Sequence, residues 1–278
     1  MSRSSRPSGA RVTGRVGRLA ALPLLWALAG GCATQPLNPS FPVTLDAAKR
    51  DLRRMSADPK PLEMPLVVIS GLLDPGVGAL TMESDFRLIS KRPRIAAISL
   101  FDCTSFEQCR RKIVDVVGRA FPFDSPRETA EVDVIGYSLG GVAARLAANP
   151  PGNQRRLHIH RLFTIDSPHQ GADRASQLPL LHPLQADLRA GSALLVRLNA
   201  TPPDFPVFAY VRLNDKPVGP ANAAVPGQPL WWVPTPPMSN PHMGAYEDAR
   251  ILADVARRLR GERPFTSLPP APLPPASP

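Results

Sequence analysis

The segment 132–148 constrains the fold of this chain more than any other. An apolar run, Val132–Ile135, leads into Gly136-Tyr137-Ser138-Leu139-Gly140, and an alanine-rich stretch with helical periodicity follows at once. This order predicts a strand, a tight turn and a helix, with glycine on both sides of the turn because a Cβ there would collide with the neighbouring strand or helix. The turn would lift the Ser138 hydroxyl out of the sheet and place it near the helix N-terminus, where developing negative charge is stabilised.

Apolar runs and helical patterns alternate along the rest of the chain. Six short runs have the length and apolar character of buried strands, at residues 65–70, 94–100, 132–135, 161–165, 207–213 and 230–233. Helical periodicity fits residues 106–120, 139–148 and 246–259. The alternation predicts an α/β fold with a mostly parallel sheet and helices on both faces. Ligand-binding residues are then expected at the carboxyl ends of the strands.

Serine needs a base to take its proton and a carboxylate to orient that base. Two aspartates downstream of Ser138 directly follow predicted strands, Asp166 and Asp215. Asp215 is the preferred acid because it lies one strand before a loop that contains a histidine, and Asp166 stays the alternative. That loop can reach back over the carboxyl edge of the sheet, so its His242 is the preferred base and His169 the alternative.

These motifs resemble those of bacterial α/β-hydrolases of the lipase and esterase type. The resemblance covers residues about 63–260, and its pieces are GYSLGG at 136–141, DSPHQG at 166–171, GSALL at 191–195, LN at 198–199, RLND at 212–215 and His242. It implies an α/β-hydrolase fold with a short cap at 172–205, after the family's sixth strand. Leucines at 178, 180, 181 and 184 give that cap an apolar face, which either shelters an acyl chain or anchors the cap to the core.

The resemblance also implies a reaction: hydrolysis of a carboxylic ester through an acyl-enzyme, by Ser138, His242 and Asp215. Two backbone N–H groups would hold the oxyanion of the tetrahedral intermediate, those of Leu139 and Leu72. The family usually has His-Gly-x in the loop of Leu72, and this chain has Ser70 in place of the histidine. Because the donor is a backbone N–H group, we expect Leu72 to bind the oxyanion without that histidine. Other contacts must then hold its loop in place.

The N-terminus is predicted to be a secretion signal. Five arginines without an acidic residue precede an apolar run at 19–29 that is too short to span a bilayer. Residues 29–32, Ala-Gly-Gly-Cys, resemble the lipobox of bacterial lipoproteins, which implies removal of residues 1–31 and lipidation (palmitate) of Cys32. An ordinary cleaved signal is the alternative. Because Ala33 is not the aspartate that retains some lipoproteins at the inner membrane, we expect the outer membrane, with the protein facing the periplasm.

Composition sets the remaining boundaries. Residues 32–62 are predicted to be an N-terminal tether that ends in a packing helix, formed by a short amphipathic stretch near 45–55. Residues 63–262 are predicted to be the hydrolase domain, and residues 263–278 a proline-rich disordered tail. The formal charge of +10 overstates basicity, since loss of residues 1–31 leaves 28 basic and 23 acidic side chains. These basic residues are scattered and form no stripe with aromatic residues, which argues against nucleic-acid binding.

Cys103 and Cys109 remain after removal of the signal. In an oxidising envelope they are predicted to form one local disulfide, with two buried thiols as the alternative. Two cysteines without a nearby histidine are too few ligands for a metal site, so we expect no metal. We expect no cofactor either.

The function expected from these features is a lipid-anchored serine esterase or lipase acting on an ester or lipid substrate. The same triad serves acyl transfer to an alcohol or amine, and cleavage of an amide or polyester, which sequence does not separate. A non-catalytic binding lipoprotein on a hydrolase scaffold is the alternative from another class. The natural ester, any structural calcium and the oligomeric state stay open.

Overall fold

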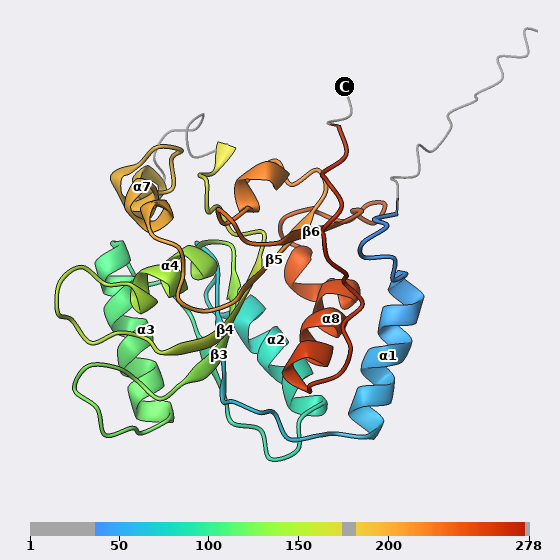
Figure 1. The fold of residues 1–278 in the computed structure, drawn as a ribbon, viewed down its shortest axis with the longest axis horizontal. Helices are drawn as coiled ribbons and strands as arrows, with labels where there is room; N and C mark the ends of the chain where they lie inside the picture. Colours follow the sequence, from blue (N-terminus) through green and yellow to red (C-terminus); the bar gives the residue numbers. More distant parts are fainter. Residues whose placement is uncertain (1–36, 174–181, 276–278) are drawn as a thin grey trace, which may run out of the picture. The chain divides into compact units, whose positions relative to one another are not determined.

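The computed structural model describes residues 37–173 and 182–275. In these residues six parallel strands form one sheet in the order β2-β1-β3-β4-β5-β6 (Figure 1). The strands are β1 (Leu66–Ile69), β2 (Ile95–Ile98), β3 (Val132–Tyr137), β4 (Ile159–Ile165), β5 (Val207–Arg212) and β6 (Leu230–Val233). Each of them overlaps a predicted apolar run. The mostly parallel sheet predicted from the sequence is therefore confirmed.

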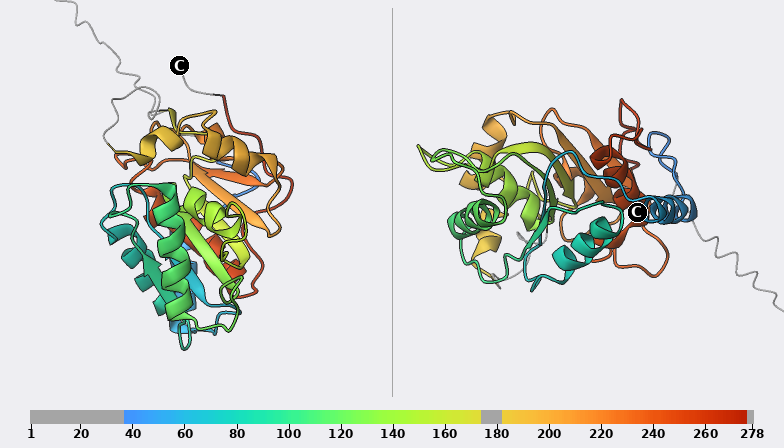
Figure 2. Two further views of the ribbon diagram at one scale, coloured as in Figure 1. Left: turned by 90° about the vertical axis from the view of Figure 1, so that its left-hand side faces the viewer. Right: turned by 90° about the horizontal axis from the view of Figure 1, so that it is seen from below.

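Helices cover both faces of this sheet, as the views in Figures 1 and 2 show. On one face lie α3 (Phe106–Ala120) and α4 (Leu139–Ala148). On the other lie α2 (Val77–Leu88) and α8 (Ala249–Leu259), with α1 (Leu45–Ala57) packed against α8. No helix in the part of the chain that the structure describes has the length and hydropathy needed to cross a bilayer.

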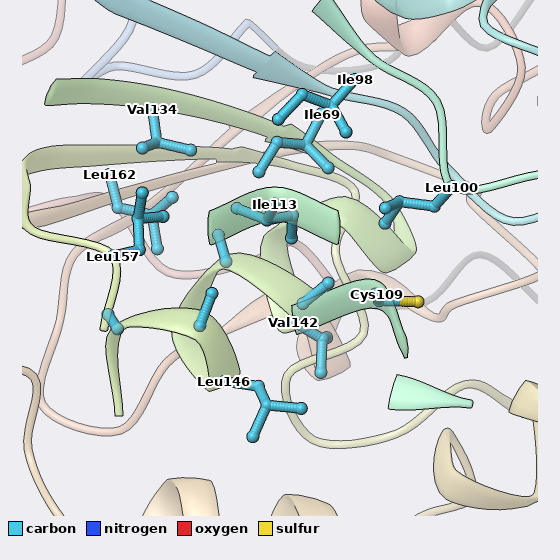
Figure 3. Packing of buried hydrophobic residues seen from close by; sticks show 14 of the residues in the cluster. Ile69, Ile98, Leu100, Cys109, Ile113, Val134, Val142, Leu146, Leu157 and Leu162 are labelled. Carbon is cyan, nitrogen blue, oxygen red and sulfur yellow. The ribbon is translucent and has the colours of Figure 1, made fainter. Parts of the chain in front are cut away.

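Each face of the sheet has its own hydrophobic core. On the α3 side, Ile69 and Val134 of the sheet share a cluster with Ile113 of α3 and Val142 of α4 (Figure 3). On the opposite face, the cluster includes Trp231 of β6, which is 1% exposed. Burying side chains of this kind contributes roughly 1.5–3 kcal/mol each. The two cores fix the sheet and thereby the loops that follow its strands.

One helix of the sheet's second layer, α2, was not predicted. It begins after Gly76, whose φ is +114° and which offers no capping side chain. A second glycine, Gly78, lies in its first turn. Both features weaken the helical signal in the sequence, and packing against the sheet compensates for them through buried residues such as Met82 and Phe86.

The described residues of the predicted cap form two short helices between β4 and β5, α6 (Leu184–Asp187) and α7 (Ala193–Ala200). Leu184, Leu195 and Leu198 are at most 2% exposed and belong to the core on the α3 side. In the described residues of the cap, these leucines therefore anchor it to the domain. The leucines at 178, 180 and 181 lie outside the described residues.

Both ends of the domain extend further than the sequence predicted. Phe41, in the predicted tether, is 1% exposed and lies in the core of the α8 face. In the predicted disordered tail, the carbonyl oxygens of Ser267 and Pro272 each accept a 2.9 Å hydrogen bond, from the indole N–H groups of Trp231 and Trp232 respectively. Proline lacks an N–H but keeps its carbonyl acceptor. A proline-rich segment can therefore pack against tryptophan donors, which composition alone does not reveal.

The predicted disulfide is not formed in the structure. Cys103, in the loop after β2, and Cys109, in α3, are free thiols. Both lie in the apolar core beside α3, where Figure 3 shows Cys109. Burial raises the pKa of both thiols, which disfavours the reactive thiolate. The alternative of two buried thiols is the one that the structure contains.

Candidate active site

Ser138 lies on the tight turn between β3 and α4. Its backbone has φ +52° and ψ −123°, a conformation that a residue with a side chain adopts only at a cost. The flanking glycines make the turn sterically feasible. A Cβ on Gly136 would lie 2.5 Å from the Gly141 Cα, and one on Gly140 would lie 2.5 Å from the Ile69 carbonyl oxygen. The strand, turn and helix predicted for this segment are therefore present.

His242 and Asp215 form a hydrogen-bonded relay with Ser138. The His242 Nε2 lies 3.1 Å from the Ser138 Oγ, and its Nδ1 lies 2.8 Å from the Asp215 Oδ2. Because a carboxylate oxygen accepts hydrogen bonds, we assign the ring proton to Nδ1, which leaves the Nε2 lone pair for the hydroxyl. The three residues follow β3, β5 and β6, whose carboxyl ends lie at one edge of the sheet. The structure thus brings together the preferred serine, base and acid.

Neighbouring groups hold the imidazole and the carboxylate in place. The Tyr137 hydroxyl donates a 3.1 Å hydrogen bond to the His242 carbonyl oxygen, and the two rings lie 5.4 Å apart between centroids. The amide of Val218 donates a 3.2 Å hydrogen bond to the Asp215 Oδ1. Burial raises the pKa of Tyr137, so its hydroxyl keeps the proton that it donates. Sequence reasoning missed Tyr137, although its place beside the serine was a signal.

Asp166, the alternative acid, lies at the end of β4 and is completely buried. Its Oδ1 accepts a 2.9 Å hydrogen bond from the Arg212 amide. Burial, and then the neighbouring Asp215, raise the pKa of Asp166 well above its usual range. The hydrogen bond to the imidazole comes from Asp215, so the geometry favours Asp215 as the orienting acid.

One atom from each of Asp166, Asp215 and His242 lies within 4.8 Å of the other two, and these atoms are of kinds that bind metal ions. The His242 Nδ1 and the Asp215 Oδ2 are already hydrogen-bonded to each other. The nitrogen and the oxygen share a proton in this hydrogen bond. Such an arrangement is typical of a hydrogen-bonded relay and not of an open metal site.

His169, the alternative base, braces the cap. It is completely buried, its Nδ1 lies 3.4 Å from the Arg145 Nη1, and its carbonyl oxygen accepts a 2.8 Å hydrogen bond from the Asn199 side chain. Arg145 of α4 also donates to the Asn199 Oδ1 at 3.0 Å and to the Leu198 carbonyl at 2.6 Å. Burial lowers the pKa of Arg145 to about 10. A charged residue in an apolar helix was the available signal for this brace, and sequence reasoning passed over it.

The two predicted oxyanion donors belong to segments next to Ser138. Leu139 is the first residue of α4, and the amides of a first helical turn have no acceptor within the helix. Leu72 follows Gly71, where an added Cβ would lie 3.1 Å from the Ser138 Cβ. The loop after β1 therefore packs against the serine turn. The role of the two amides stays a prediction.

Ser70, which replaces the histidine of the family motif, helps to hold the loop after β1 in place. Its Oγ is buried and accepts a 3.1 Å hydrogen bond from the amide of Leu100. Nearby, the Ser99 hydroxyl donates to the Asp74 carbonyl at 3.0 Å, and the Asp74 carboxylate accepts from the Gly76 amide at 2.8 Å. These contacts tie the loop after β1 to the loop after β2 and to the start of α2.

Known proteins share this architecture. The PGAP1-like alpha/beta domain family matches residues 97–189. The crystal structure of the mature lipase BlEst2 from Bacillus licheniformis is similar, with a TM-score of 0.54 and 15% identity over 75% of this chain and 94% of that chain. The propeptide form of BlEst2 gives a TM-score of 0.50 and 15% identity over 78% of this chain and 54% of that chain. No curated protein matches the sequence significantly. The fold is that of an α/β-hydrolase, as the sequence predicted.

Proposed function

We propose that the protein is a serine hydrolase of the cell envelope that cleaves carboxylic esters through an acyl-enzyme. The observation that carries this proposal is the relay from the Ser138 Oγ to the His242 imidazole at 3.1 Å and on to Asp215 at 2.8 Å. The similarity in fold to a bacterial lipase supports it. The lipobox-like residues 29–32 support the envelope location.

Acylation begins with proton transfer from the Ser138 Oγ to the His242 Nε2 while the oxygen attacks the ester carbonyl carbon. The carbonyl electron pair moves onto its oxygen, and the N–H groups of Leu139 and Leu72 hold the resulting oxyanion. Asp215 remains ionised and stabilises the imidazolium. When the intermediate collapses, the bond to the alcohol oxygen breaks and His242 gives that oxygen its proton.

Deacylation repeats these steps with water. His242 takes a proton from the water, whose oxygen attacks the acyl carbon attached to Ser138. The second intermediate releases the carboxylic acid, and the proton returns from His242 to the Ser138 oxygen. Atoms and charges balance with the ester and water alone.

The substrate class follows from the loops that flank the serine. Leu73, next to the oxyanion donor Leu72, is 54% exposed, and Met243, next to His242, is 56% exposed. Exposed apolar side chains beside a reactive group offer surface for contact with an apolar ligand. We infer that the acyl part of the ester is apolar.

The first prediction concerns the nucleophile. Purified protein without residues 1–32 should hydrolyse p-nitrophenyl esters, and Ser138→Ala should lower kcat by at least about 10³-fold because the acyl-enzyme cannot form. The matched control is Ser105→Ala. The Ser105 hydroxyl caps α3 by accepting a 3.2 Å hydrogen bond from the Gln108 amide. Its loss should cost about 1 kcal/mol of stability and leave kcat unchanged.

A serine-reactive fluorophosphonate separates this proposal from a non-catalytic binding protein. The probe should label the native protein and fail to label Ser138→Ala. A folded native protein that is neither labelled nor active on esters of short and long acyl chains would contradict the proposal. Product analysis with a competing alcohol then shows whether water or the alcohol receives the acyl group.

A further inference from the structure

Asp166 occupies an unusual place beside the relay. Its φ is +46°, a left-handed conformation in which glycine is favoured and Asp and Asn are tolerated. Its side chain is 0% exposed. Both the burial of the carboxyl group and the strained backbone conformation cost free energy. The residue is also not used by the mechanism described above.

The hydrogen bonds to the two neighbouring carboxyl groups are unequal. Asp215 has a donor on each oxygen, from Val218 at 3.2 Å and from His242 at 2.8 Å. In the described part of the chain, Asp166 has one donor, the Arg212 amide, on its Oδ1. Its Oδ2 is buried and has no hydrogen-bond donor among the described residues. The two carboxyl groups approach each other within 4.8 Å. A proton on the Asp166 Oδ2 is the group that would satisfy this oxygen.

The surrounding charges do not favour a second carboxylate here. The guanidinium of Arg212 is the nearby cation, and it lies 3.1 Å from the Asp248 carboxylate, which also accepts from Arg250 at 2.7 Å. Its Nη1 donates to the Asn240 carbonyl at 3.1 Å. This cation is therefore shared with other acceptors.

Besides His242, the Tyr137 hydroxyl faces the pair, and its own pKa is raised by burial and then by Asp166 and Asp215. Two ionised carboxylates in such surroundings repel each other, and one of them holds a proton. Asp215 has the larger number of donors, so the proton belongs to Asp166.

We propose that Asp166 is a neutral carboxylic acid that donates a hydrogen bond from its Oδ2 to Asp215 and thereby positions that carboxylate for His242. The proposal deepens the proposed function, on which it rests. Asp166 touches neither substrate nor a reacting atom, so it is a positioning residue. Burial of Asp166 and its proximity to Asp215 raise its pKa, in agreement with this protonation state.

A neutral Asp166 leaves the Asp215 carboxylate as the one negative charge of the pair beside the imidazole. A second ionised carboxylate would further stabilise the imidazolium form, which cannot act as a base. A neutral donor fixes the orientation of the Asp215 carboxylate and adds no charge. It also moderates the basicity of that carboxylate by sharing its electron density.

Two substitutions test the proposal without disturbing the backbone. Asp166→Asn keeps a donor toward Asp215, an acceptor for the Arg212 amide and tolerance of φ +46°. Asp166→Gly accepts the same φ and removes the side chain. The readout is the pH midpoint at which the His242 ring titrates by NMR, together with the acid limb of the pH dependence of kcat. Both are measured on protein without residues 1–32.

In Asp166→Asn we expect the midpoint and the acid limb to stay within about 0.3 pH units of the native values, with kcat within about threefold, because one neutral donor replaces another. In Asp166→Gly we expect both to move up by at least about half a unit and kcat to fall about tenfold or more, with KM changed little. A merely structural role would not move the midpoint.

Three results would overturn the proposal. A midpoint that falls by more than about half a unit in Asp166→Asn means that the native residue is ionised. An unchanged midpoint in Asp166→Gly means that it is not coupled to Asp215. If the native protein shows no carboxylic-acid infrared band that is lost in Asp166→Asn, then Asp166 holds no proton. The NMR and infrared readouts need no turnover, so failure of esterase activity alone is distinguishable from failure of this proposal.

Discussion

The backbone at Ser138 is strained at the residue that carries the nucleophile. Its φ of +52° costs on the order of 1–3 kcal/mol for a residue with a side chain. The turn is held by hydrogen bonds from the Ser138 amide to the Ile165 carbonyl at 2.8 Å and from the Gly141 amide to the Ser138 carbonyl at 3.2 Å. These bonds, together with two glycines that let β3 and α4 approach, keep the hydroxyl at the sheet edge.

At this scale we predict a large penalty for a side chain at Gly140. Gly140→Ala places a Cβ 2.5 Å from the Ile69 carbonyl oxygen, and neither backbone can move away freely. The free energy of unfolding should fall by at least about 2 kcal/mol, as measured by urea denaturation.

The matched control is Gly118→Ala in α3, where the added Cβ would meet only the flexible end of the Arg155 side chain at 3.2 Å. That change should be neutral or stabilising by up to about 1 kcal/mol, because alanine favours a helix. Equal effects of the two substitutions would rule out steric contact as the reason for glycine in the turn.

Among the elements, α1 is attached to α8 and to the segment after it by paired charges. Asp51 of α1 accepts a 2.6 Å hydrogen bond from the Arg257 Nε. Arg54 of α1 donates to Glu262 at 2.5 Å, and Arg260 donates to the same carboxylate at 3.0 Å. These pairs hold α1, the packing helix predicted at the end of the tether, against the domain.

The charged attachment predicts acid sensitivity. Burial raises the pKa of Glu262, but hydrogen bonds from Arg54 and Arg260 outweigh it and lower the pKa to about 2. A carboxyl pKa below its unfolded value of about 4.3 adds stability above that pH, and this stability is lost as the pH falls toward about 2. Glu262→Gln should therefore be less stable than the native protein at pH 7, and the two should converge near pH 2.

Urea denaturation across this pH range measures the difference. Asp51, whose pKa is also lowered by its arginine partners despite burial, remains in the variant, so only part of the acid dependence should disappear. The control is Glu63→Gln, a site whose side chain is 55% exposed, where the stability should differ little at any pH. A constant gap between native and Glu262→Gln down to pH 2 would disprove the linkage.

Across the whole molecule, the candidate site exists because parallel strands end at one edge. Ser138 and His242 are 104 positions apart in the chain and 3.1 Å apart in space. Asp166 and Asp215 arrive at the same edge from β4 and β5. All six strands of the described sheet run in the same direction, so each of them ends at that edge and the loops that follow them converge there, although they are far apart in sequence.

Attachment to the membrane is a property of the whole protein, and we predict that it depends on Cys32. If Cys32 is lipidated, Cys32→Ser should abolish incorporation of labelled palmitate and shift the protein from the detergent phase to the aqueous phase in phase partitioning, since acyl chains provide the membrane affinity. Esterase activity on soluble esters should be unchanged, because Cys32 is not part of the relay. Labelling that persists in Cys32→Ser would show that the lipid is attached elsewhere or that the lipobox assignment is wrong.

Much of the architecture was predictable because it depends on local patterns. Every strand overlapped an apolar run, and α3 and α4 matched their predicted bounds. The misses share a different origin. Helix α2 has glycines in place of start signals, the proline-rich tail packs through carbonyl acceptors, and Cys109 is shielded in the core. Each of these outcomes depends on neighbours that are distant in the chain.

The sequence by itself determined the alternation of strands and helices, the turn at Ser138 and the short set of acids and histidines available to it. These follow from residue spacing and from the conformations that glycine allows. Only the tertiary structure decided that Asp215, and not Asp166, bonds to the imidazole. Only it placed the second carboxyl group beside the first. The physical reason is that hydrogen bonding and protonation depend on distances and burial, which exist only once remote segments have packed together.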